Sequence, residues 1–193
     1  MYTVSALRDL TDVIIPHFLK YPLITKKQID FFLFKSIIEL IKAQKHLTED
    51  GLEEIVNIKA ILNQGLTGRL KEAFPNSNSI LKPSLLYTEI QDPNWLAGFV
   101  NGDGSFCVYA QHKSINPKKI TIVRPIFSIT QHNRDFELLN SFIKYLNCGY
   151  ITKSKNSSGC NFTVSKYKDI INYIIPFFNK HPLLGCKKKD FYD

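Results

Sequence analysis

The sequence predicts an α+β fold, in which a four-stranded antiparallel sheet carries helices on one face. Four segments are predicted to be strands: residues 105–113, 119–132, 149–155 and 160–166. Apolar and polar side chains alternate in the first, in most of the second and in the fourth. Three segments have apolar residues at helical spacing: residues 93–102, 135–146 and 167–178. The order is therefore helix, strand, strand, helix, strand, strand, helix. Two hairpins in this order form one sheet, and the helices cover the face that carries its apolar side chains.

A long internal repeat organises the chain. Residues 3–31 recur as residues 163–191 without a gap, at an offset of 160 residues and with 14 of 29 positions identical. Helix propensity alone does not produce such a match, so we expect two copies of one unit. We divide the chain into the mostly helical C-terminal part of a first repeat (residues 1–63), a connector (64–92) and a second repeat without its last helices (93–193). The repeat indicates that the sequence is a segment of a longer protein with two repeats. A small duplication at the two ends is the weaker alternative.

The first repeat is predicted to be helical, apart from the end of a strand at Thr3–Ser5. Pro22 ends its first helix, and Thr25 is a suitable N-cap for the second. The helices are expected at residues 6–19, 26–45 and 47–63, with a short helical piece in the connector at 69–74.

Composition excludes several classes of protein. Of the 193 residues, 44% are apolar, which is enough for a folded core and excludes a disordered tail. No apolar run reaches the ~18 residues that a membrane span needs. The four cysteines are scattered without a C-x-x-C pair, which argues against a zinc ribbon or a disulfide scaffold. Arg8, Asp9 and Asp12 fall where the apolar region of a signal peptide would lie.

The positive charge is concentrated in the second half of the chain. Residues 1–92 carry 11 basic and 11 acidic side chains, whereas residues 93–193 carry 14 basic and 6 acidic ones. The formal net charge of +8 therefore belongs to the second repeat. Such a surplus is typical of surfaces that meet nucleic acids or anionic membranes, and a solubilising surface is the plain alternative.

The polar face of the predicted sheet is a candidate DNA-binding surface, since a β-ribbon fits the major groove. Alternation places Phe106, Val108 and Ala110 toward the helices, and the apolar phase slips near Val123, which predicts a β-bulge beside Pro125. An ordinary solvated sheet face is the alternative. The outward-facing side chains that we expect to contact DNA are Ser105, Cys107, Tyr109, Gln111, Lys113, Arg124, Ser128, Thr130, Lys155, Asn161, Thr163 and Ser165.

The segment WLAGFVNGDGSF, at residues 95–106, carries the strongest chemical signal. Asp103 follows its helix at the C-terminal end, where the helix dipole disfavours a carboxylate unless a cation is shared. Mg²⁺ binds through one or two carboxylates, waters and phosphate oxygens, so Asp103 is a candidate ligand. A glycine-rich helix end with a solvated carboxylate is the alternative. The helix also presents small residues that allow a second helix to approach closely: Ala97, Gly98, Asn101 and Gly102.

With its flanks, LAGFVNGDG (Leu96–Gly104) resembles the LAGLIDADG motif of homing endonucleases. The identities lie at Leu96, Ala97, Gly98, Asp103 and Gly104. The resemblance is to the two-repeat, single-chain members that are typical of mitochondrial introns. It extends through PHFLKYPLITKKQIDFFLFK, HLTEDGLEEIVNIKAILNQGL, LKEAFPN, DPNWLAGFVNGDGSF, FSITQHNRD and YLNCGYI.

The resemblance implies two αββαββα repeats that pack through their motif helices, with two sheets forming a saddle over a long DNA site. It implies a hydrolase that cuts both strands of a specific site with divalent metal ions such as Mg²⁺, held by one acidic residue from each motif. Carried over by position, Asp103 is the metal-binding acid. Gln131 and Lys153 resemble the residues that order water and phosphate around the metal. Asp103 stands where close relatives often have Glu, which is also a carboxylate.

The chain contains one motif, and by the 160-residue period a second copy would fall before Met1. The resemblance therefore implies that a second chain or an N-terminal repeat completes the helix interface. Two alternatives to the nuclease stay open: an RNA maturase that assists intron splicing on the same fold, and a non-catalytic remnant that binds nucleic acid. The resemblance implies a mitochondrial, organelle-encoded protein with no membrane partner.

Overall fold

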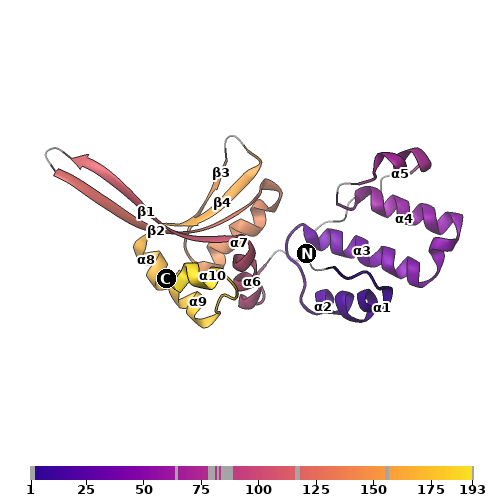
Figure 1. Cartoon of the computed structure of the whole chain (residues 1–193), viewed down its shortest axis with the longest axis horizontal. Coiled ribbons are helices and arrows are strands. Elements are labelled where there is room, and N and C mark those ends of the chain that lie inside the picture. Colours follow the sequence, from indigo (N-terminus) through magenta and orange to yellow (C-terminus); the bar gives the residue numbers. More distant parts are fainter. Residues whose placement is uncertain are drawn as a thin grey trace. The chain divides into compact units, whose positions relative to one another are not determined.

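The computed structural model describes residues 3–63, 65–77, 81, 83, 89–115, 118–154 and 157–192. The chain divides into two compact units, Met1–Tyr87 and Thr88–Asp193 (Figure 1). No helix within the described ranges is long and apolar enough to cross a membrane.

The first unit is helical, as expected. Its core lies between α3 and α4, where Ile29, Leu33, Ile58 and Leu62 are buried together. The hydroxyl of Thr48 caps α4 by accepting a hydrogen bond from the backbone N–H of Gly51 at 3.2 Å. The elements are α1 (Leu7–Asp9), a π-helical turn (Leu10–Ile14), α2 (Ile15–Lys20), α3 (Lys27–Lys42), a 3₁₀ turn (Lys45–Leu47), α4 (Glu49–Ile61) and α5 (Gly68–Ala73).

The expected strand end at Thr3–Ser5 is wrong. These residues have no regular secondary structure, although Thr163 and Val164, at the equivalent positions of the repeat, belong to strand β4. The same side chains form a strand only in the second unit because β2 and β3 flank β4 there and supply partners for its backbone groups.

The second unit has the expected order of elements, which confirms the α+β fold class. Most predicted boundaries lie within a few residues of the observed ones. The elements are α6 (Pro93–Asp103), β1 (Gly104–Ile115), β2 (Lys118–His132), a 3₁₀ turn (Asn133–Asp135), α7 (Phe136–Leu146), β3 (Tyr150–Lys153), β4 (Gly159–Val164), α8 (Tyr167–Asp169), a π-helical turn (Ile170–Ile174), α9 (Ile175–Lys180) and α10 (Lys187–Tyr192).

The four strands form one antiparallel sheet in the order β1-β2-β4-β3, with the helices on one face (Figure 1). A cluster of phenylalanine rings joins the helices to this face. Phe178 of α9 packs 5.5 Å from both Phe106 of β1 and Phe127 of β2, measured between ring centroids. Phe142 of α7 packs 5.8 Å from Phe162 of β4. We call the opposite side of the sheet the open face.

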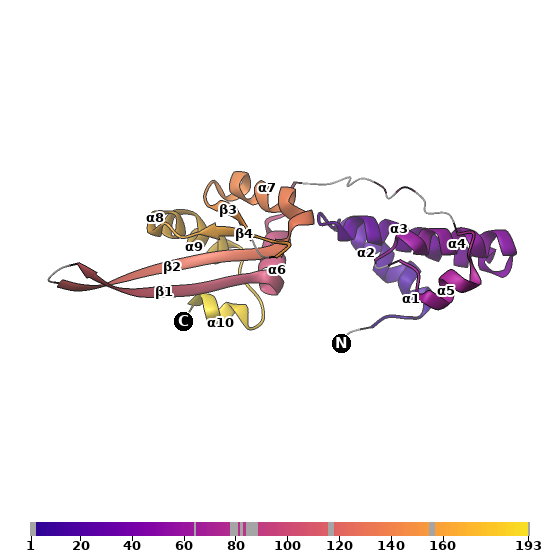
Figure 2. The same ribbon diagram turned by 90° about the horizontal axis from the view of Figure 1, so that it is seen from above.

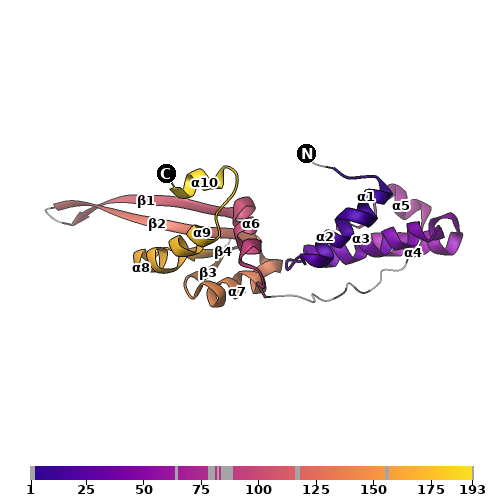
Figure 3. The ribbon, with the colours of Figure 1, turned by 90° about the horizontal axis from the view of Figure 1, so that it is seen from below.

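The predicted β-bulge beside Pro125 is also wrong, because β1 and β2 pair in one continuous register from Gly104↔Ile129 to Ile115↔Lys118. Pairing with β4 ends at Phe127, so Pro125 lies where β2 has a neighbour on one side only, and such an edge tolerates proline. The change of the apolar residues from even-numbered to odd-numbered positions near Val123 has another cause. The distal half of the hairpin extends past the helices (Figures 2 and 3), and Val123 is 60% exposed there.

The same extension corrects the expectation that Val108 and Ala110 pack against the helices. Both share a face with Phe106, but both are exposed, and Val108 has 67% of its surface accessible. The apolar residues of the distal hairpin therefore do not belong to a hydrophobic core.

The two copies of the sequence repeat have the same backbone conformation. Residues 5–32 and 165–192 carry the same succession of helical and turn states, including a π-helical turn in each. In the first copy the N–H of Ile15 bonds to the carbonyl of Leu10, and in the second the N–H of Ile175 bonds to the carbonyl of Ile170. Each π-helical turn is followed by a proline, Pro16 or Pro176.

Candidate nucleic-acid interface and metal site

Helix α6 fixes the position of Asp103. The carboxylate of Asp92 caps its start by accepting a hydrogen bond from the N–H of Asn94 at 2.8 Å, and Pro93 occupies the first turn. Leu96 and Val100 anchor the helix, since both are fully buried. The helix ends at Asp103, whose side chain is exposed.

The structure brings Asp103 and Gln131 together. Nε2 of Gln131, near the end of β2, donates a hydrogen bond of 2.6 Å to Oδ2 of Asp103. Gly104 makes this approach possible, because a Cβ at that position would lie 2.7 Å from the carbonyl oxygen of Val100. The chain can therefore pass directly from α6 into β1 and hold the carboxylate beside the sheet.

Lys153 lies in the same row of the sheet as Gln131 but does not reach the carboxylate. Cys160 of β4 pairs with Gln131 on one side and with Lys153 on the other, so the three side chains share one face. The Lys153 amine lies 4.3 Å above the ring centroid of Phe136, not beside Asp103.

Cys160, between these two residues, is a structural thiol. Burial raises its pKa, and the nearby charge of Asp135 adds to the rise while that of Lys153 opposes it. The side chain is fully buried. Because a nucleophile needs an accessible thiolate, Cys160 serves as buried packing between Gln131 and Lys153.

The small residues of α6 lie on two sides of the helix. Ala97 is buried with Leu96 and Val100, whereas Gly98 and Gly102 are exposed, and a Cβ built on either would meet nothing within 4 Å. Asn101 lies between these sides and accepts a hydrogen bond of 3.1 Å from the N–H of Leu184, in the loop between α9 and α10. Ala97 thus packs inside its own unit.

The open face carries two rows of polar side chains across the strands. One row crosses the whole sheet with a hydroxyl at every position: Ser105, Ser128, Thr163 and Tyr150. The next row crosses three strands: Thr130, Asn161 and Thr152. Toward the tip of the hairpin the open face continues with further cross-strand pairs: Cys107–Ile126, Tyr109–Arg124 and Gln111–Ile122.

Most of the expected DNA-contacting residues therefore share the open face. Ser165 does not, because β4 ends at Val164 and Ser165 leads into α8. The side chain of Lys113 and the whole of Lys155 lie outside the described residues. Sequence reasoning missed Tyr150 and Thr152, and it missed three isoleucines that lie on this face with Arg124. Counting in steps of two from Arg124 would have found them: Ile120, Ile122 and Ile126.

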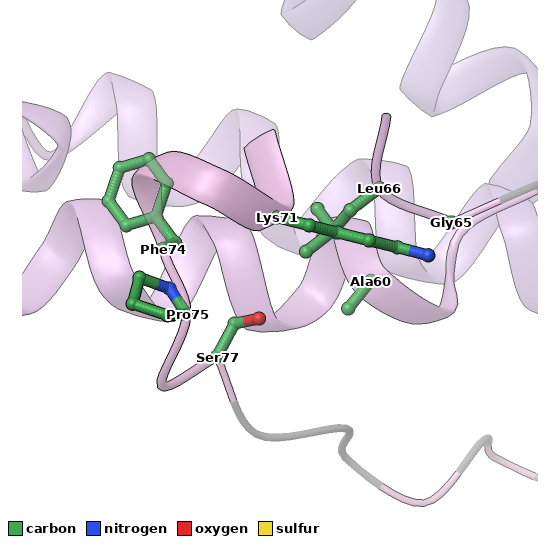
Figure 4. Close-up of a pocket in the computed structure, with 7 residues that line it drawn as sticks. All are labelled: Ala60, Gly65, Leu66, Lys71, Phe74, Pro75 and Ser77. Atoms are coloured by element: carbon green, nitrogen blue, oxygen red, sulfur yellow. The ribbon is translucent and has the colours of Figure 1, made fainter. Parts of the chain in front are cut away.

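Other features offer weaker sites. In the described ranges, no three His, Cys, Asp or Glu side chains gather into a group that could hold a metal ion alone. A pocket of about 420 Å³ in the first unit is lined by Lys71, Phe74, Ala60 and main chain near Gly65 (Figure 4). Nζ of Lys59 donates a 2.6 Å hydrogen bond to the carbonyl of Gly65, one of the lining residues. This pocket lacks convergent catalytic groups among its described lining residues.

Fold and site together define an α+β protein with an open polar sheet and an acidic helix end beside it. The sequence pattern of the family described as LAGLIDADG endonuclease matches residues 1–38 and 96–193. Because these ranges cover more than half of the chain, the protein belongs to the LAGLIDADG endonuclease family.

Relatives and solved structures agree with this assignment. The probable intron-encoded endonuclease 2 of Neurospora crassa is 41% identical over 98% of this chain and 42% of its own length. The I-SmaMI LAGLIDADG homing endonuclease bound to cleaved DNA is 42% identical, with a TM-score of 0.91 over 97% of this chain and 62% of its own. The I-LtrWI homing endonuclease bound to target DNA is 41% identical, with a TM-score of 0.93 over 98% of this chain and 63% of its own. The chain thus spans less than two thirds of each.

Proposed function

We propose that this chain supplies one catalytic half of an endonuclease that hydrolyses double-stranded DNA at a specific site. The observation that carries the proposal is the hydrogen bond from Gln131 to Asp103, which orients a carboxylate at the junction of α6 and β1, beside the end of the sheet. The related I-SmaMI and I-LtrWI proteins are described as bound to DNA, which supports duplex DNA as the partner. Lys and Arg side chains of the second unit would neutralise phosphates and make the affinity depend on salt.

Asp103 fits the role of a Mg²⁺ ligand. Gln131 bonds to Oδ2, while Oδ1 accepts no hydrogen bond in the described part of the chain. One carboxylate oxygen, together with waters and DNA phosphate oxygens, is a donor set that Mg²⁺ accepts. When bound, the ion would supply Lewis-acid stabilisation and a more acidic water. Gln131 would hold the carboxylate rotamer, and Lys153 would neutralise a phosphate when its flexible stem leaves the Phe136 ring.

A second motif helix is part of this proposal. The exposed side of α6, with Gly98 and Gly102, would pack against the equivalent helix of a second copy or of a further repeat, which brings the second carboxylate. We also propose that residues 1–63 are the end of a first repeat, 64–92 the connector and 93–193 the second repeat. The matching conformations of residues 5–32 and 165–192 support this division. The intron-encoded relative supports synthesis in the organelle that holds the intron, which we propose to be the mitochondrion.

The test is a binding and cleavage assay on a duplex that carries the intron-insertion site of the host gene. It uses the chain alone and a version preceded by a second motif-bearing repeat. We expect both to bind, and the extended version to cut both strands when Mg²⁺ is present. Asp103→Asn should abolish cutting and keep binding, whereas Asp12→Asn, an exposed carboxylate of the first unit, should change neither.

Two results would contradict the proposal. Failure of both versions to bind the duplex would remove the DNA-binding function. Cutting that survives Asp103→Asn would remove the assigned role of the carboxylate. If the chain promotes splicing of its host intron and cuts no DNA, the maturase takes the place of the nuclease.

A further inference from the structure

The distal hairpin of β1 and β2 has two chemically different faces. The continuous register puts Tyr109 opposite Arg124 and Gln111 opposite Ile122 on the open face. On the other face, His112 Nδ1 and Thr121 Oγ1 form a hydrogen bond of 3.0 Å. That second face continues into the helix-covered side of the sheet. The first continues into the two rows of polar side chains on the open face, so it is the face that a DNA duplex on the open sheet would meet.

Charge on the hairpin favours DNA as the occupant. Between Gly104 and His132 the sequence has four basic residues and no Asp or Glu. Arg124 is exposed, and no carboxylate forms an ion pair with it among the residues that the structure describes. An arginine held on a strand and free of an acidic partner is available for a bidentate contact with a planar acceptor pair.

Isoleucines on a surface that meets DNA need an apolar partner. Ile122 is partly exposed on the open face, and Ile120 is 39% exposed two residues away. In the major groove the apolar group is the C5-methyl group of thymine, and the paired acceptors O6 and N7 belong to guanine, the base that arginine contacts most often. Residues two apart on a strand are ~6.7 Å apart, about the rise of two base pairs of B-DNA.

We propose that Arg124 recognises a guanine and that Ile122 recognises the methyl group of a thymine about two base pairs away, so that β2 sets the sequence preference of this half-site. Ile120, two residues before Ile122 on the same face of β2, adds one more apolar side chain to this surface. The inference rests on the proposed DNA-binding function and adds the bases that the hairpin selects. It depends on the absence of the bulge at Pro125, because a bulge would turn the isoleucines to the other face.

The experiment begins with selection of duplexes from a randomised library by the full chain. The selected duplex is then made with deoxyuridine in place of each thymine in turn, which removes one methyl group and nothing else. One substitution should weaken binding by the wild type about threefold to fivefold, the value of one buried methyl group. Ile122→Ala should bind both duplexes equally. Val123→Ala, the exposed neighbour on the opposite face, should keep the wild-type discrimination.

A second arm tests the arginine. Replacing the selected guanine by 7-deazaguanine removes the N7 acceptor and should weaken wild-type binding about fivefold or more. Arg124→Gln should lose that dependence. The hairpin proposal is overturned if the selected duplexes lack a guanine near a thymine, or if uracil binds like thymine to the wild type. If no duplex is enriched at all, the proposed DNA-binding function fails as well, so the two failures are distinguishable.

Discussion

The ring of Phe191 meets that of Phe178 with 5.6 Å between centroids, and the ring of Phe31 meets that of Phe18 at the same distance. Each residue of the second pair lies 160 positions before its counterpart. The repeat therefore preserves a packing contact as well as a sequence. In the second unit this contact belongs to the core that fixes the sheet on which Asp103 and Gln131 lie.

Replacing Phe178 by alanine should lower the free energy of unfolding of the second unit by ~3–5 kcal/mol, because the ring is fully buried against four other phenylalanines. Urea denaturation followed by the fluorescence of Trp95, the single tryptophan, reports this unit. Phe18→Ala is the matched control: its ring lies in the first unit, so the Trp95 transition should not move. An unchanged midpoint in Phe178→Ala would contradict the described core.

Asn101 should hold the loop between α9 and α10 against the end of α6. In Asn101→Ala the N–H of Leu184 loses its acceptor, at a cost of ~1 kcal/mol. Hydrogen exchange of the Leu184 amide, measured by NMR, should become faster. Asn101→Asp keeps an acceptor oxygen and should retain slow exchange. Equal exchange rates in Asn101→Ala and the wild type would show that this bond does not form in solution.

The four cysteines should separate into two reactive and two unreactive thiols. Cys107 and Cys186 are exposed, whereas Cys148 and Cys160 are buried. Burial, and then the charge of Asp169, raise the pKa of Cys148 to about 11, so its thiol stays neutral as the pH rises to 9. A maleimide should therefore modify two sites across pH 7–9, as counted by mass spectrometry.

Duplex DNA should protect Cys107 from the maleimide, because Cys107 lies on the open face, and should leave Cys186 reactive. Cys186 is the internal control for reagent loss. Protection of Cys186 alone would place the duplex on another surface.

Gly98→Ala should stabilise the chain by ~0.5–1 kcal/mol when it is dilute, because alanine is the better helix former and the new Cβ meets nothing within 4 Å. The same change should weaken self-association in sedimentation experiments if this side of α6 pairs with another helix. Gly104→Ala is the contrasting variant, since its Cβ would lie 2.5 Å from Cγ1 of Val100 and should destabilise the fold. If Gly98→Ala destabilised the dilute chain, this side of α6 would already be packed within the monomer.

Local pattern sufficed for the element order. The role of Gln131 near the Asp103 carboxylate comes from the resemblance to the LAGLIDADG family and not from local pattern. Local pattern failed where an element depends on distant neighbours. Thr3–Ser5 has the residues of a strand, but no strand flanks it among the residues that the structure describes, and Val123 is apolar without being buried. The predicted bulge at Pro125 rests on the premise that apolar side chains point to a core. That premise does not hold on a hairpin that extends past its helices.

The π-helical turns at Leu10–Ile14 and Ile170–Ile174 also carry information about ancestry. A π-helical turn is an uncommon irregularity, equivalent to one residue inserted into an α-helix. Two independent insertions at the same place, each followed by a proline, would be a coincidence. The irregular helix therefore existed before the gene segment was duplicated, and both descendants have kept it while half of the surrounding side chains changed.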